Sequence, residues 1–93
     1  MIDFKKLPSN SIHGDGIQYI FKADNGYGAS IVQHDFSYGA NKGLWELAVI
    51  KYDKLIEDEI SWDICYSTPI TDDVLGYLND EEVNETLDKI SKL

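Results

Sequence analysis

Alternation of apolar and polar residues predicts four extended segments along the chain. Over 17–22 aromatic and β-branched residues recur at every second position, Ile17, Tyr19 and Phe21, which is the period of a strand, and 27–34 resumes an extended pattern. The pair Asn25-Gly26 stands between them and tolerates positive φ, so the two strands are expected to form a hairpin. A third strand is predicted over 44–52, where both faces are mainly apolar and the strand should be central. The fourth, over 59–67, has one apolar face.

The period of the apolar residues becomes helical after Pro69, and two short C-terminal helices are predicted, over 72–78 and 80–91. The second begins with Asn79 and Glu82 at the spacing of a capping box, and its apolar residues recur at i, i+4 and i+7. These residues are Val83, Leu87 and Ile90. The chain is therefore expected to be a single α+β domain over residues 1–93, with about four antiparallel strands and a helix covering one face.

Weaker patterns precede and interrupt these elements. A short element is expected over 2–7, followed by a loop up to Gly16, because the Pro, Ser, Asn and Gly residues between them are typical of turns. Gly28 lies inside the second predicted strand. It indicates either a bulge or a place where an aromatic neighbour packs on bare backbone.

The charge is unevenly distributed along the chain. Its 93 residues include 17 acidic and eight basic side chains, for a net charge of −9. Residues 1–52 are neutral overall, so the whole excess lies in 53–93. Direct nucleic-acid binding and membrane-surface binding are both disfavoured, because each needs a basic patch.

The apolar runs, the cysteine and the histidines bear on cellular location and on catalytic chemistry. No run approaches 18 apolar residues, and Cys65 is the only cysteine, so neither a signal peptide nor a membrane span is indicated and a reducing cytoplasm is expected. His13, His34 and Cys65 lack the spacing of a zinc site. A nucleophilic pair would require Cys65 to face His34 across the sheet, whereas a lone cysteine is more often a small apolar residue. We therefore expect no catalytic residue, no metal, no cofactor and no enzyme activity.

Two groups of residues are candidates for partner binding. The acidic group forms a solvated surface, or it imitates the phosphate spacing of a duplex or docks on a basic cleft of another protein. The aromatic group either forms a hydrophobic contact at an interface or packs inside the domain. The acidic candidates are Asp53, Glu57, Asp58, Glu59, Asp72, Asp73, Glu81, Glu82, Glu85 and Asp88, and the aromatic ones are Phe36, Tyr38 and Trp45.

Four segments together resemble a group of short uncharacterised proteins encoded by bacteriophages and prophages. They are NGYGASIV (25–32), YG (38–39), LWELAV (44–49) and TPITDDVLGYL (68–78). The resemblance implies an origin and carries no activity, cofactor or catalytic residue. By analogy with small acidic phage proteins, it favours an inhibitor that binds a host or defence protein with a basic surface, in the cytoplasm of the bacterial host. The alternative is a self-associating accessory module, a homodimer in which the strand around 60–66 pairs with its twin.

Overall fold

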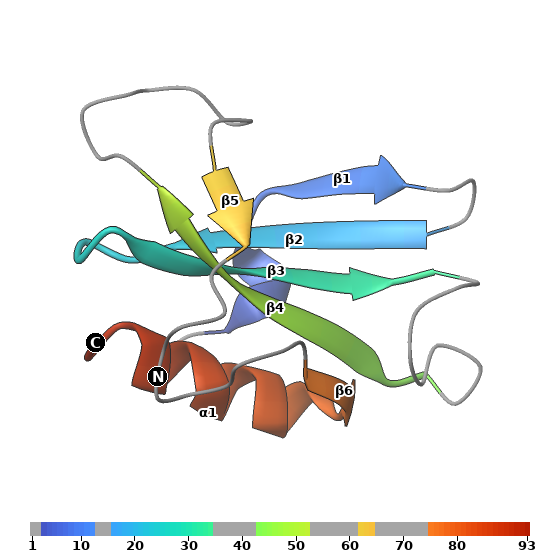
Figure 1. Ribbon diagram of the computed structural model, residues 1–93. Helices are drawn as coiled ribbons and strands as arrows, with labels where there is room; N and C mark the ends of the chain where they lie inside the picture. The colour runs from blue at the N-terminus through green and yellow to red at the C-terminus, as the bar shows by residue number, and fades with distance from the viewer. Residues whose placement is uncertain (1–2, 13–15, 35–42, 53–61, 65–74) are drawn as a thin grey trace.

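An antiparallel sheet with one helix packed against it makes up the part of the chain that is described here (Figure 1). The computed structural model describes residues 3–12, 16–34, 43–52, 62–64 and 75–93. The elements, in chain order, are the 3₁₀ turn η1 (Phe4–Lys6), β1 (Ser9–Ile12), β2 (Gly16–Lys22), β3 (Tyr27–Gln33), β4 (Trp45–Tyr52), β5 (Trp62–Ile64), β6 (Leu75–Leu78) and α1 (Asp80–Ile90). The α+β class is confirmed.

Strand β4 is central, as the apolar character of both its faces predicts. The strands follow the order β1-β2-β3-β4-β5, and β6 also pairs with β4. β4 thus contacts β3 along one side, with β6 near its start and β5 near its end on the other side. Val49 and Ile50, which are consecutive and point to opposite faces, are both fully buried.

The predicted hairpin at Asn25-Gly26 is confirmed. Lys22 of β2 pairs with Gly28 of β3, and Gly26 adopts a φ of 84° in the turn. The Asn25 side chain accepts a hydrogen bond from the backbone N–H of Tyr27 at 3.0 Å. It also donates to the carbonyl oxygen of Ile90 at 2.8 Å. The turn residue therefore satisfies a backbone group at the end of α1, where carbonyls lack helical partners.

Gly28 marks a close approach of backbone rather than a bulge. The β2–β3 register runs without a shift from Ile17 to Lys22. A Cβ atom at Gly28 would run into the carbonyl oxygen of Phe21 and lie 2.9 Å from its carbonyl carbon. A residue without a side chain is required here, but the close neighbour is the main chain of Phe21 and not an aromatic ring.

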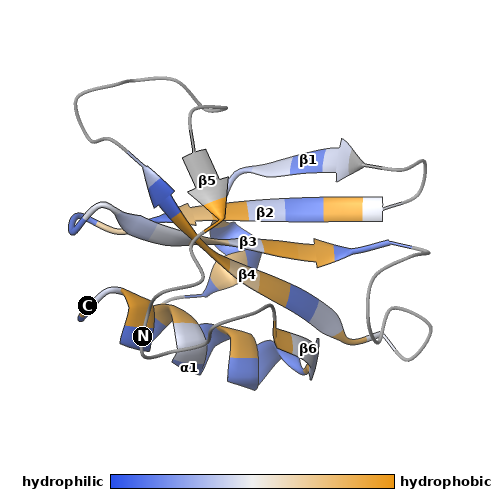
Figure 2. Cartoon of the chain, in the orientation of Figure 1, coloured by the Kyte–Doolittle hydropathy of each residue, from blue (hydrophilic) through white to orange (hydrophobic). Residues whose placement is uncertain are grey.

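The predicted helix over 80–91 is confirmed together with its capping box. Asn79 accepts a hydrogen bond from the backbone N–H of Glu82 at 2.8 Å, and the Glu82 carboxylate accepts one from the N–H of Asn79 at 3.0 Å. The apolar side of the helix packs on the sheet, and its hydrophilic side faces away from it (Figure 2). The helical residues buried in the core are Val83, Thr86, Leu87 and Ile90.

The prediction of a helix over 72–78 is wrong for residues 75–78, which the structure describes. Residues 75–78 form β6, and 72–74 lie outside the described residues. Leu75 pairs with Leu47 and Leu78 with Trp45, so β6 has one residue more than β4 between these pairs. A spacing of three between apolar residues therefore serves a bulged strand as well as a helix, and Gly76 is a poor helix former.

Strand β1 replaces part of the predicted N-terminal loop. Ser9–Ile12 pairs with β2 along its whole length, although Ser-Asn-Ser has no apolar alternation to indicate a strand. The strands predicted over 17–22, 27–34 and 44–52 are confirmed to within one residue at each end. Of the strand predicted over 59–67, Trp62–Ile64 forms β5, which stands at one end of the sheet order, and the remainder lies outside the described residues.

No helix in the described ranges has the length and apolar character required to cross a membrane.

Candidate functional site

Four acidic side chains lie together on the side of α1 that points away from the sheet. Glu81, Glu82 and Glu85 are exposed, and Asp88 is half-buried. With 3.6 residues per turn, they fall within an arc of about 120°, opposite the buried side of the helix. We call these four residues the acidic face of α1.

The acidic face has a charge spacing that approaches that of a nucleic-acid duplex. From Glu81 to Asp88 the helix axis advances about 10 Å at 1.5 Å per residue. Four carboxylates over this length give one charge per roughly 2.5–3 Å, whereas duplex DNA carries one per about 1.7 Å. Lys89 adds one positive charge in the last turn, beside Asp88, so the negative charge is densest toward the start of the helix.

Neighbouring groups leave most of this charge available. Between the residues that the structure describes, no ion pair involves Glu81, Glu82, Glu85 or Asp88. The Glu82 carboxylate accepts one hydrogen bond, from the backbone N–H of Asn79, and a carboxylate has further acceptor sites. The acidic face is therefore a surface of carboxylates held by a helix whose start is capped.

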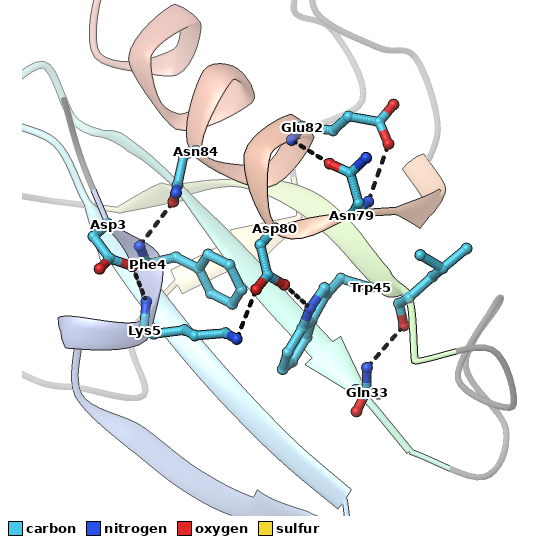
Figure 3. A network of polar contacts seen from close by, with 10 residues as sticks. Asp3, Phe4, Lys5, Gln33, Trp45, Asn79, Asp80, Glu82 and Asn84 are labelled. Carbon is cyan, nitrogen blue, oxygen red and sulfur yellow. Dashed lines mark hydrogen bonds and ion pairs between the residues drawn. The ribbon is translucent and has the colours of Figure 1, made fainter.

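Asp80, the first residue of α1, fixes the helix to two other elements (Figure 3). Lys5 of η1 approaches the carboxylate to 2.6 Å, and the indole N–H of Trp45 donates to it at 2.9 Å. The hydrogen bond from Lys5, assisted by that from Trp45, lowers the pKa of Asp80, although partial burial acts in the opposite direction. The same pair raises the pKa of Lys5.

A second bond fixes η1 to α1. The backbone N–H of Phe4 donates to the side-chain oxygen of Asn84 at 2.9 Å (Figure 3). The first two turns of α1, which carry the start of the acidic face, are thus held to η1 at two positions, Asp80 and Asn84. Neither Asp80 nor Asn84 was among the expected site residues, because their role depends on a contact with the other end of the chain.

Trp45 lies in the core. Its side chain is 6% exposed, and its ring meets those of Phe4 and Tyr19 edge-on, with centroids 5.0 and 5.7 Å away. Of the two roles considered for the aromatic group, Trp45 has the internal one and offers almost no surface to a partner. Phe36 and Tyr38 lie outside the described residues.

The structure brings together only part of the acidic group. The four members on α1 share one face, whereas the other six lie outside the described residues. Those six are Asp53, Glu57, Asp58, Glu59, Asp72 and Asp73.

The described residues contain no candidate metal centre, since no three His, Cys, Asp or Glu side chains among them are grouped to hold an ion. His34 is half-buried just after β3, and His13 and Cys65 lie outside the described residues. A cavity of about 350 Å³ lies beside the start of β1. Its lining consists of Leu7, Pro8, Asn10, Ile20, Phe21 and Lys22, which include neither a carboxylate nor a histidine.

Comparisons with protein-family models, with curated proteins and with solved structures give no match.

Proposed function

We propose that this chain is a small non-enzymatic interaction protein that binds a basic surface of another protein through the acidic face of α1. The observation that supports the proposal is the convergence of Glu81, Glu82, Glu85 and Asp88 on one exposed helix side. Several negatively charged carboxylates on one surface attract a basic partner and increase the rate at which the two proteins meet.

The local structure suits such a role because little ordering is needed on binding. The capping box at Asn79 and Glu82 fixes the first turn of α1, and Lys5 and Trp45 hold Asp80 against the domain. A helix whose position is set before binding loses less conformational freedom on association. Its carboxylates then meet the partner in a defined arrangement.

The partner that fits this surface best is a protein that itself binds nucleic acid. The charge spacing of the acidic face approaches that of a duplex. The chain would therefore occupy the phosphate-binding cleft of the partner protein and inhibit that protein. Together with the resemblance to phage-encoded proteins, this favours a host or defence protein of bacteria as the target.

The test removes charge from the acidic face while keeping the helix. In a triple variant, Glu81→Gln, Glu82→Gln and Glu85→Gln, the capping box is retained because Gln also serves at its third helical position. The control variant removes three charges elsewhere in the chain, by Asp3→Asn, Asp24→Asn and Glu46→Gln. A protein captured on the native chain from a bacterial lysate is then purified, and its affinity for each variant is measured at rising salt.

We expect the triple variant to bind about tenfold or more weakly than the native chain, and the control variant to bind nearly as the native chain does. The native affinity should also fall steeply as salt screens the charges. Displacement of the partner from labelled duplex DNA by the native chain would support a nucleic-acid-like mode of binding. Equal binding of the native chain and the triple variant, or an affinity that ignores salt, contradicts the proposal.

A further inference from the structure

Strand β1 is the outermost strand of the sheet on the side remote from α1 (Figure 1). Among the described residues it pairs with β2 alone. The helix packs on β3, β4 and β6, so β2 lies between β1 and β3, the nearest strand that contacts the helix.

The hydrogen-bond pattern shows which backbone groups of β1 face outward. In an antiparallel pair, hydrogen-bonded and non-bonded residue pairs alternate. The N–H of Ile20 donates to the carbonyl oxygen of Pro8, and the register places Asn10 opposite Gln18. Asn10 is therefore bonded to β2, whereas the N–H and C=O groups of Ser9 and Ser11 point away from it.

The next pair of strands confirms this alternation. The N–H of Ala23 donates to the carbonyl oxygen of Tyr27, so the odd-numbered residues of β2 bond to β3 and the even-numbered ones to β1. The outer edge of β1 thus carries four main-chain groups, two donors and two acceptors.

Within the described residues, β1 carries no charged side chain, proline or bulge that would oppose pairing. Natural edge strands carry lysine, proline or a bulge that prevents the addition of another strand. Ser9, Asn10 and Ser11 are exposed and uncharged, and the pairing of β1 with β2 shows no register shift. Of the two strands at the other side of the sheet, β6 differs from β1, because it carries a bulge with Tyr77 at a φ of 59°.

We propose that β1 is the site at which a second copy of this chain adds as an antiparallel strand, forming a symmetric dimer with one continuous sheet. With the two-fold axis at Asn10, Ser9 of one copy lies opposite Ser11 of the other, and all four outward groups of each copy are bonded. The two Asn10 side chains face each other across the axis, and a carboxamide both donates and accepts.

The distribution of charge is compatible with a second copy at this edge. Each chain has a net charge of −9, which opposes self-association. At β1 the chains meet through uncharged residues, and the acidic face of α1 lies on the far part of the fold (Figure 1). The inference does not depend on the proposed function, which uses the other side of the molecule.

The dimer is expected to be weak, because two four-residue strands bury less than the roughly 1,200 Å² of a stable interface. The experiment is a dilution series of the native chain, from millimolar to micromolar, followed by sedimentation and by amide NMR spectra. We expect a concentration-dependent dimer whose shift changes centre on residues 9–12. The amide protons of Ser9 and Ser11 should exchange more slowly in the dimer, whereas that of Asn10, already bonded to β2, should change little.

Salt separates this association from the proposed partner binding. Added salt screens the repulsion between two chains of the same charge, so the dimer should tighten severalfold as salt rises. Binding of a basic partner to the acidic face should weaken over the same range. If the dimer does not tighten with salt, the proposed partner binding is unaffected, and if partner binding does not weaken with salt, the proposed dimer is unaffected.

Two variants test the edge directly. Ser11→Pro removes an outward N–H at a position where an edge strand accepts proline. Because each copy loses this donor, the symmetric dimer loses two hydrogen bonds. Its dissociation constant should rise at least tenfold, whereas Ser11→Thr, which keeps the N–H, should dimerise as the native chain does. Asn10→Asp places two like charges across the axis while keeping the backbone bonds, and salt should partly restore its dimer.

Circular dichroism shows whether each variant folds. If Ser11→Pro does not fold, the dissociation constant of the Asn10→Asp dimer tests the proposal. A monomer at all concentrations overturns the proposal. A dimer whose shift changes lie on β5 or α1 also overturns it. The same holds if Asn10→Asp and a folded Ser11→Pro both dimerise as tightly as the native chain.

Discussion

Asp80 joins three parts of the chain through one carboxylate. Lys5 comes from the N-terminal turn, Trp45 from the central strand, and Asp80 itself begins the helix. The hydrogen bond from Lys5 stabilises the ionised form most, and the pKa of Asp80 is lowered. Folding therefore favours the carboxylate over the protonated acid, which makes part of the stability dependent on pH.

The direction of this dependence follows from the lowered pKa. Above the ordinary Asp pKa of 3.8, the contribution of Asp80 to stability is fully present, and it is lost as pH falls through the lower pKa of the folded state. Asp80→Asn keeps an oxygen for Trp45 but lacks the charge. In urea unfolding near pH 7 the native chain should have the higher midpoint, and this advantage should disappear in strong acid. Glu85→Gln is the matched control for the loss of one charge from α1, and an advantage that stays constant with pH contradicts the prediction.

The pairing of β2 with β3 depends on Gly28 having no side chain. A Cβ there would meet the backbone of Phe21, and no rotamer change relieves a contact between main-chain atoms. Gly28→Ala must push the two strands apart, and we expect it to lower the free energy of unfolding by about 3 kcal/mol. Gly43 has a φ of 71° with open space around it, so Gly43→Ala should cost only the backbone strain, about 1 kcal/mol.

Urea unfolding of the two alanine variants measures this difference. If Gly28→Ala costs no more than Gly43→Ala, the strands do not approach as closely as described.

Elements that carry their own period or cap could be predicted from the sequence, and elements defined by a neighbour could not. The first hairpin strand has a period of two, the turn Asn25-Gly26 follows it, and α1 begins with Asn79 and Glu82 at capping spacing. β1 has only polar residues apart from Ile12 and forms because β2 offers it hydrogen bonds. β6 has the apolar spacing of a helix, but the free side of β4 pairs with it, and tertiary pairing overrides a weak local preference.

For the whole molecule, the charge distribution and the helical period together predicted the acidic face. The excess of acidic residues lies in 53–93, and the apolar positions of α1 leave the acidic ones on its outer side. The role of Trp45 could not be predicted, because the same aromatic side chain serves a core or an interface according to its neighbours. Those neighbours, Phe4 and Tyr19, come from distant elements.

Phe4 closes the core at the place where the two ends of the chain meet. It is fully buried, its ring lies 5.2 Å from that of Tyr19 and 5.0 Å from that of Trp45, and its N–H donates to Asn84 of α1. Phe4→Ala should therefore reduce the free energy of unfolding by about 3–5 kcal/mol, a large part of the roughly 5–15 kcal/mol typical of a domain. Phe4→Leu keeps most of the apolar volume and should lose less than half as much. Urea unfolding gives both values, and near-UV circular dichroism should show the aromatic cluster loosened in the alanine variant alone. An alanine variant within about 1 kcal/mol of the native chain would mean that the N-terminal turn does not complete the core between sheet and helix.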